Sequence, residues 1–181
     1  MILSGRSIFN AIETGTIEIE PFNENQLNPN SYDLRLSDKV IAYKPGVVLD
    51  CAKEPAADEY ETIDIPLEGL LLQPGRLYLM STIERTYAPN TVPLIEGRSS
   101  LARLGVSVHS AAGFGDVGFN GTWTLEVSVI NPVRIYARMR VCQVYFLKMK
   151  ESFKENYYHS KYQGQIGPKL SRVFIEAHEW K

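Results

Sequence analysis

The stretch Lys39-Val-Ile-Ala-Tyr-Lys-Pro-Gly-Val-Val-Leu49 shows the pattern that decides the fold. A run of β-forming residues is followed by a Pro-Gly turn and a second such run. The pattern continues toward Ala88 in further short runs at 62–65, 70–72 and 77–81, with Pro66 and Pro74-Gly75 between them. Many short β-rich runs separated by Gly and Pro indicate an all-β sandwich or barrel.

A second stretch, Thr122-Trp-Thr-Leu-Glu-Val-Ser-Val129, alternates apolar and polar residues as a half-buried strand does. Trp123 and Leu125 are expected on one face, with Thr124 and Glu126 together on the other. That second face is either exposed to water or the lining of a site. A half-buried strand is expected at 31–36, with Asp33 and Arg35 on its polar face. Further strands are expected at 106–109 and 133–136, the last forming a hairpin with 141–147. A helix over 5–14 is expected after Ser4.

The length, composition and net charge are those of an ordinary globular protein. The 181 residues suit one domain, and the formal net charge of -2 argues against a nucleic-acid partner while permitting a local basic pocket. No apolar run is long enough to span a bilayer, and the start of the chain lacks the features of a signal peptide, so we expect a cytoplasmic protein without a membrane partner. Cys51 and Cys142 offer no disulfide framework, and both are expected to be buried.

The stretch Glu96-Gly-Arg-Ser-Ser-Leu-Ala-Arg-Leu-Gly105 is a candidate anion site. Arginine presents a planar fork of donors suited to phosphate, and serine adds hydroxyl and backbone donors. A solvated turn that leads into one helical turn explains the same residues equally well.

Two other segments combine glycine with polar residues. Residues 111–121 contain four glycines around Asp116, which is either a turn former or a site residue. Residues 151–181 form a polar and aromatic C-terminal tail that is either disordered or a lid over a bound anion. The three histidines show no mutual spacing typical of a metal site.

Several motifs in order resemble the dCTP deaminases, which are related to the dUTP diphosphatases. The motifs are GRSSLARLG at 97–105, AGFGDVGFNG at 112–121, TLE at 124–126, RVCQ at 140–143 and YHSKYQGQIG at 158–167, with SYDLRL at 31–36 as a weaker match. The resemblance covers nearly the whole chain. It implies a distorted β-barrel or jelly-roll of the dUTPase-like type, assembled as a homotrimer with sites at subunit interfaces.

The resemblance also implies roles for individual residues. Glu126 would be the general base and acid, with Ser99 and Arg103 beside the water and the base, and Asp116 would contact the sugar. Arg98 and Ser100 would bind mainly phosphate. The remaining nucleotide-binding residues implied by the family pattern are Leu101, Ala102, Thr124, Leu125, Gln143, Tyr158, Lys161 and Gln165. Tyr157 could replace Tyr158.

The expected reaction is hydrolytic deamination without zinc, because the zinc-binding signature of other nucleobase deaminases is absent. Magnesium is expected only on the triphosphate. Gly113-Phe114 stands where deaminases that make only dUTP are expected to carry His-Arg. A bifunctional enzyme that releases dUMP, diphosphate and ammonia is therefore expected, with Asp116 also serving the second hydrolysis. Gly115 in place of the usual Ile departs from that pattern. The alternatives are a deaminase that stops at dUTP, a dUTP diphosphatase, and a non-catalytic nucleotide sensor.

Overall fold

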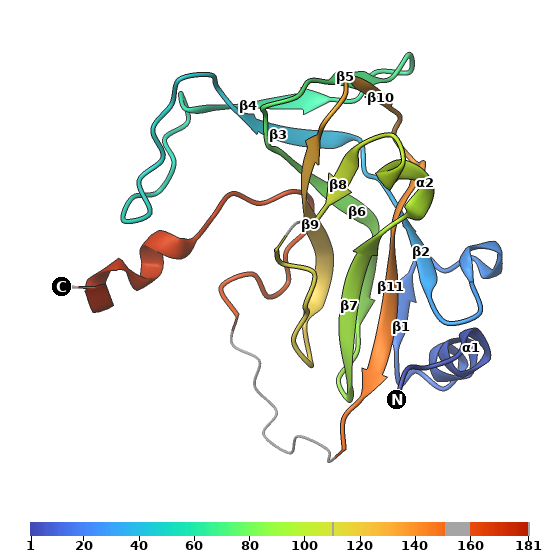
Figure 1. Cartoon of the computed structure of the whole chain (residues 1–181). Coiled ribbons are helices and arrows are strands. Elements are labelled where there is room, and N and C mark those ends of the chain that lie inside the picture. The colour runs from blue at the N-terminus through green and yellow to red at the C-terminus, as the bar shows by residue number, and fades with distance from the viewer. Residues whose placement is uncertain (110, 151–159, 181) are drawn as a thin grey trace.

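A computed structural model describes residues 1–109, 111–150 and 160–180. The chain forms eleven β-strands and four short helices within these ranges, of which η1 and η2 are 3-10 helices (Figure 1). The elements are α1 (Gly5–Glu13), β1 (Glu18–Glu20), η1 (Glu24–Gln26), β2 (Tyr32–Arg35), β3 (Lys39–Tyr43), β4 (Tyr60–Asp64), β5 (Leu70–Leu72), β6 (Tyr78–Tyr87), β7 (Thr91–Gly97), α2 (Ser99–Ala102), β8 (Val106–Val108), β9 (Asn120–Val129), β10 (Val133–Ile135), β11 (Arg140–Lys148) and η2 (Val173–Trp180).

Helix α1 begins where the sequence predicts it. The Ser4 hydroxyl accepts a hydrogen bond from the backbone N–H of Ser7 at 3.2 Å, which satisfies one of the free donors of the first turn. Ile8 is fully buried and holds the helix against the core. The helix ends at Glu13, one residue before the expected boundary.

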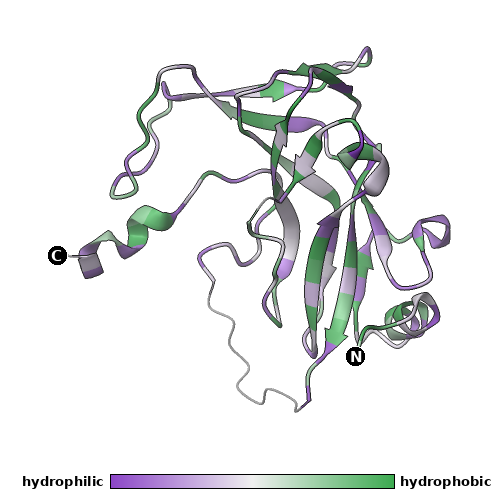
Figure 2. Cartoon of the chain, viewed as in Figure 1, coloured by the Kyte–Doolittle hydropathy of each residue, from purple (hydrophilic) through white to green (hydrophobic). Residues whose placement is uncertain are grey.

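The strands form three sheets around one core. A six-stranded sheet has the order β4-β3-β6-β9-β8, with β1 paired to β6; β2, β11 and β7 form a second sheet, and β10 pairs with β5. Fully buried apolar side chains come from both larger sheets, including Leu34 and Phe146 from one and Met80 and Leu125 from the other. Apolar segments lie along the central strands in Figure 2. The architecture is the all-β fold that the sequence predicts.

The expected hairpin between residues 133–136 and 141–147 is wrong. Strand β10 pairs with β5, more than sixty residues earlier, with Arg134 opposite Leu71. Strand β11 lies instead between β2 and β7. The chain changes direction at Arg138, whose φ is 65° and whose backbone N–H donates to Leu36 at 2.8 Å. The expected short strand at 47–49 is also absent, since these residues form no ladder in the described structure.

Strand β2 is more deeply buried than the half-buried strand that its alternating sequence predicts. Its burial pattern places Asp33 inside the protein, with a side chain only 3% exposed. Its neighbour Arg35 pairs through Nε with the fully buried Glu84 at 2.6 Å, and its backbone N–H donates to the same carboxylate at 2.7 Å. Gln26 adds a third donor to Glu84 at 3.0 Å. The buried carboxylate is thus compensated by charge and hydrogen bonds, as burial of a charge requires.

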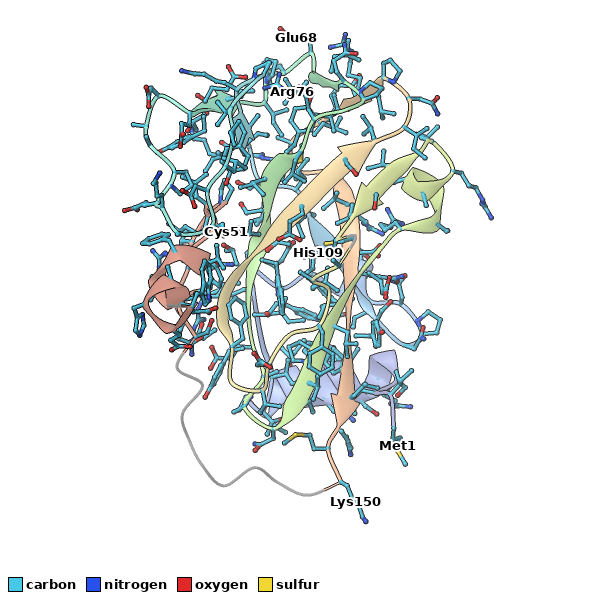
Figure 3. All side chains as sticks on the ribbon, turned by 60° about the vertical axis from the view of Figure 1, so that its left-hand side comes forward. Met1, Cys51, Glu68, Arg76, His109 and Lys150 are labelled. Atoms are coloured by element: carbon cyan, nitrogen blue, oxygen red, sulfur yellow. The ribbon has the colours of Figure 1, made fainter. Side chains whose placement is uncertain are left out.

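The two cysteines lie in different environments. Cys142 is fully buried on β11, as expected, and burial raises the pKa of its thiol above the ordinary value. Cys51 is exposed, so the expectation that both are buried is wrong. Figure 3 shows it beside the C-terminal helix η2, in the excursion between β3 and β4. Among the described residues, no helix is both long and apolar enough to cross a membrane.

Candidate active site

Strand β9 carries the centre of the candidate site. Its burial alternates as predicted: Trp123 and Leu125 are buried, whereas Thr124 and Glu126 are partly exposed. Thr124 and Glu126 line a cavity of about 540 Å³, together with Asp116 and Gln165. Leu125 points into the core and is fully buried, so its side chain does not line the cavity. Any contact of Leu125 with a ligand must therefore come from its backbone.

Most of the other lining residues are apolar or aromatic. They include Tyr43, Leu79, Phe114, Phe119 and Trp123. Such walls with a few polar groups are typical of small-molecule sites. Burial raises the pKa of the Tyr43 phenol, and an interaction with the backbone of Ser171 acts in the opposite direction. The phenol is therefore neutral at physiological pH.

His109 contacts the Glu126 carboxylate directly. Its Nδ1 lies 2.5 Å from Oε2 of Glu126, and its side chain is only 3% exposed. Nε2 of His109 is buried and has no hydrogen-bond partner among the described residues. The backbone reaches this position through a left-handed conformation with φ of 55°, which is uncommon for a residue other than glycine. Figure 3 shows His109 near the middle of the molecule, beside β9.

His109 is not singled out by any local sequence pattern, because it is seventeen positions from Glu126 and belongs to no metal-binding pattern. The signal that could have found it is the pairing of β8 with β9. Val108 is the last residue of β8 and lies opposite Val127, so the residue that follows it reaches Glu126.

Asp116 lies on the cavity wall in the glycine-rich segment between β8 and β9, and its side chain is exposed. The neighbouring Gly115 is buried, and its N–H donates to the Pro93 carbonyl at 2.9 Å. A Cβ at Gly115 would lie 2.3 Å from Cη2 of Trp123. The indole therefore occupies the space that the side chain of the usual Ile would need, and the segment is closely packed around the glycine.

The C-terminal tail closes one side of the cavity. Gln165 donates through Nε2 to the Thr122 carbonyl at 2.7 Å, and Thr122 returns a backbone hydrogen bond at 3.0 Å. The backbone N–H of Lys169 donates to Oγ1 of Thr124 at 3.1 Å. Figure 1 shows the tail running beside β9 before it reaches η2. Residues 163–169 thus lie against the strand that carries Glu126.

Not all tail residues expected at the site line the cavity. Lys161 does not line it and instead forms an ion pair with Glu176. Tyr158 and the alternative Tyr157 lie outside the described residues.

The arginine- and serine-rich motif lies elsewhere on the chain. None of the described residues from Arg98 to Arg103 lines the cavity, nor does Gln143. Ser99, Ser100, Ala102 and Arg103 are exposed on and after α2, and Leu101 packs against the core. Gln143 accepts a hydrogen bond from the Ser31 hydroxyl at 2.9 Å. A single chain thus presents two separate groups: the carboxylates in the cavity, and the arginines and serines around α2.

The described residues contain no group of three or more His, Cys, Asp and Glu side chains that could hold a metal ion. Asp116 and Glu126 are the two carboxylates among the described lining residues. Magnesium bound to phosphates commonly needs only one or two protein carboxylates. Asp116 and Glu126 are therefore compatible with a magnesium ion that is bound mainly by the phosphates of a nucleotide.

Comparison with known proteins identifies the family. Residues 2–149 match the family model described as dCTP deaminase-like, and the chain belongs to this family. A protein of Hathewaya histolytica named "dCTP deaminase, dUMP-forming" is 49% identical over 174 residues, which cover 96% of this chain and 98% of the relative. A protein of Cytophaga hutchinsonii with the same name is 44% identical over 96% of this chain and 97% of its own length.

A crystal structure of 2'-deoxycytidine 5'-triphosphate deaminase from Agrobacterium tumefaciens has the same fold. Its TM-score is 0.64 at 19% sequence identity, and the match covers 82% of this chain. This chain spans 48% of that longer chain.

Proposed function

We propose that the protein deaminates dCTP hydrolytically and then cleaves the triphosphate, so that dCTP and two waters give dUMP, diphosphate and ammonia. The observation that carries this proposal is the placement of Glu126 on the wall of a largely apolar cavity, in contact with His109. The names of relatives that match nearly the whole chain support the same reaction.

Deamination requires one group that first accepts and then donates a proton. Glu126 removes a proton from the water that attacks the amine-bearing carbon of the cytosine and passes it to the ring nitrogen. It then takes the second proton from the new hydroxyl group and passes it to the departing amine, which leaves as ammonia. The apolar walls limit access of bulk water and strengthen the electrostatic interactions within the cavity. His109 restricts the carboxylate to one orientation.

Asp116 is proposed to serve the second hydrolysis. It lies on the same cavity wall as Glu126, and its carboxylate is accessible to a water that would attack the phosphate chain. A magnesium ion bound through the triphosphate would supply neutralisation of phosphate charge there. Gly113-Phe114 precedes Asp116 in place of the His-Arg pair expected of enzymes that stop at dUTP.

We propose that the complete site combines residues of two copies in a homotrimer. The separation of the α2 residues from the cavity supports this arrangement. Within one chain, residues 98–103 do not line the cavity that holds Glu126, so they would not reach a nucleotide bound there. Refolding a mixture of Glu126→Gln and Arg103→Ala tests it. If each site takes one half from each of two copies at random, roughly a quarter of the wild-type activity should return. No recovery would place both halves in one copy and overturn the arrangement.

An incubation with dCTP and magnesium, and a parallel one with dUTP and magnesium, test the proposed reaction. Accumulation of dUMP, diphosphate and ammonia supports both steps, whereas dUTP with ammonia supports the deaminase that stops at dUTP. Hydrolysis of dUTP without attack on dCTP would identify a diphosphatase. Nucleotide binding without any product would support the alternative of a non-catalytic nucleotide sensor.

The Glu126→Gln variant tests the assigned base. Ammonia release should be abolished while dCTP still binds, because the amide keeps the shape but cannot accept the proton. Glu13→Gln, at the exposed end of α1, is the matched control and should keep full activity. Deamination by Glu126→Gln at the wild-type rate would remove Glu126 from this role.

A further inference from the structure

A buried carboxylate joins two arginines beside α2. The Asp33 side chain is 3% exposed, and its two oxygens face Arg98 Nε and Arg140 Nη1, each at 3.4 Å. Asn28 donates a further hydrogen bond from Nδ2 to Oδ1 at 3.1 Å. A carboxylate removed from water in this way needs its cationic partners, so it fixes where their guanidinium groups lie.

Sheet pairing brings the three residues together from distant parts of the chain. Strand β11 lies between β2 and β7, with Gln143 opposite Asp33 on one side and Cys142 opposite Gly97 on the other. Arg98 follows Gly97 directly and occupies the N-cap position of α2. These neighbouring strands and α2 can be followed in Figure 1.

Two further hydrogen bonds hold the arginines in place. Arg98 Nη1 donates to the Arg140 carbonyl at 3.4 Å, and Arg140 Nη2 donates to the Asn25 carbonyl at 2.9 Å. Both guanidinium groups nevertheless remain accessible, since their side chains are 35% and 41% exposed. They are therefore positioned by the protein and open to a ligand at the same time.

The charge balance distinguishes this group from an ordinary ion pair. In the nearby pair, one arginine, Arg35, compensates one buried carboxylate, Glu84. Around Asp33, two arginines share one carboxylate, which leaves a surplus positive charge at the surface. Two guanidinium groups held close together repel each other, so the arrangement carries an electrostatic cost that a bound anion removes. Guanidinium donors in a fixed geometry suit phosphate oxygens.

We infer that Asp33 is a positioning residue that holds Arg98 and Arg140 as one anion-binding pair, and that Arg140 is a further contact for the phosphate chain of the nucleotide. This inference rests on the proposed function for the identity of the anion. The expectation from the family pattern includes Arg98 but assigns no role to Arg140 or Asp33.

The first test compares Arg140→Gln with Arg134→Gln. Arg134 is an exposed arginine on β10 that donates to the Gly69 carbonyl, so the control removes the same charge elsewhere. Loss of a charge-assisted hydrogen bond to phosphate should raise the KM for dCTP by about tenfold or more in Arg140→Gln. The kcat for ammonia release should change less than about threefold, because Arg140 does not touch the reacting ring carbon. An unchanged KM in a folded Arg140→Gln variant overturns the inference.

The second test asks whether Asp33 acts through the arginine. Asp33→Asn keeps the shape but loses the charge, and it should also raise KM. In the Asp33→Asn/Arg140→Gln double variant, the increase in KM should be smaller than the product of the two single increases. The reason is that Asp33 acts by positioning the Arg140 guanidinium, which the double variant lacks. If the increase in KM of the double variant equals the product of the two single increases, Asp33 has only a structural role. If Asp33→Asn does not fold, Arg140→Gln decides the inference by itself.

A third readout does not depend on the reaction. Inorganic tripolyphosphate should raise the melting temperature of the wild type and of Arg134→Gln, and should raise it less in Arg140→Gln. If the wild type releases no ammonia from dCTP, the proposed function fails while this comparison still tests the arginine pair. Equal stabilisation of all three proteins would show that Arg140 contributes no anion contact.

Discussion

Replacing Gly115 with alanine probes the packing behind Asp116. The added Cβ would lie 2.3 Å from Cη2 of Trp123 and 2.9 Å from the Pro93 carbonyl oxygen. Neither neighbour can move freely. The indole Nε1 donates to Oγ1 of Thr86 at 2.9 Å, and the Pro93 carbonyl accepts the Gly115 N–H. One methyl group is thus forced into an already filled space.

The expected cost follows from these contacts. Overpacking of a well-filled core costs about 1–3 kcal/mol, and in a chain of this size each kcal/mol lowers the melting temperature by about 2–4 °C. The Gly115→Ala variant should therefore melt roughly 2–12 °C below the wild type. Because Asp116 is the next residue, diphosphate release should fall more than ammonia release.

Thermal unfolding at one fixed protein concentration measures this cost, since assembly would make the melting temperature depend on concentration. Gly97→Ala is a matched control for stability, because its Cβ would meet Val108 at 3.8 Å, an ordinary van der Waals distance. That variant should melt close to the wild type.

Trp123→Phe tests the cause of the cost. Phenylalanine lacks the outer ring atoms that the new methyl group meets, so Gly115→Ala should cost less stability in the Trp123→Phe background than in the wild type. An unchanged melting temperature of Gly115→Ala, or an equal cost in both backgrounds, would refute the packing argument.

Three further outcomes are expected. Glu84→Ala should lower the free energy of unfolding in urea by about 3–5 kcal/mol, because it leaves the Arg35 charge without its buried partner. His109→Asn suits the left-handed backbone but is too short to reach Glu126, so kcat for ammonia release should fall about tenfold; an unchanged kcat would make the contact incidental. In the native protein a thiol reagent at mildly alkaline pH should modify Cys51 alone, because burial and a raised pKa keep Cys142 protonated; mass spectrometry of the labelled peptides checks this.

Local sequence patterns predicted several elements well. The alternation along β9 correctly separated Leu125, which packs in the core, from Glu126, which lines the cavity. The Ser4 cap marked the start of α1. These features depend on neighbouring residues in the chain, namely the two-residue period of a strand and the free N–H groups of a first turn. The ordered motifs were also sufficient to identify the family.

Long-range packing could not be predicted in the same way. The partner of β10 is β5 rather than the following strand, since pairing depends on the whole path of the chain. The acid at Asp33 was expected on a polar face, but it is buried because β11 and α2 bring Arg98 and Arg140 over it.

The sequence by itself determined the strand-rich composition, the faces of individual strands and the residue types available for phosphate and proton transfer. Only the tertiary structure decided which of these residues meet. It brought His109 to Glu126, matched Gly115 to Trp123, and placed the α2 arginines away from the cavity carboxylates. The physical reason is range: alternation and capping act over a few residues, whereas these contacts join segments that only the closed sheets bring together.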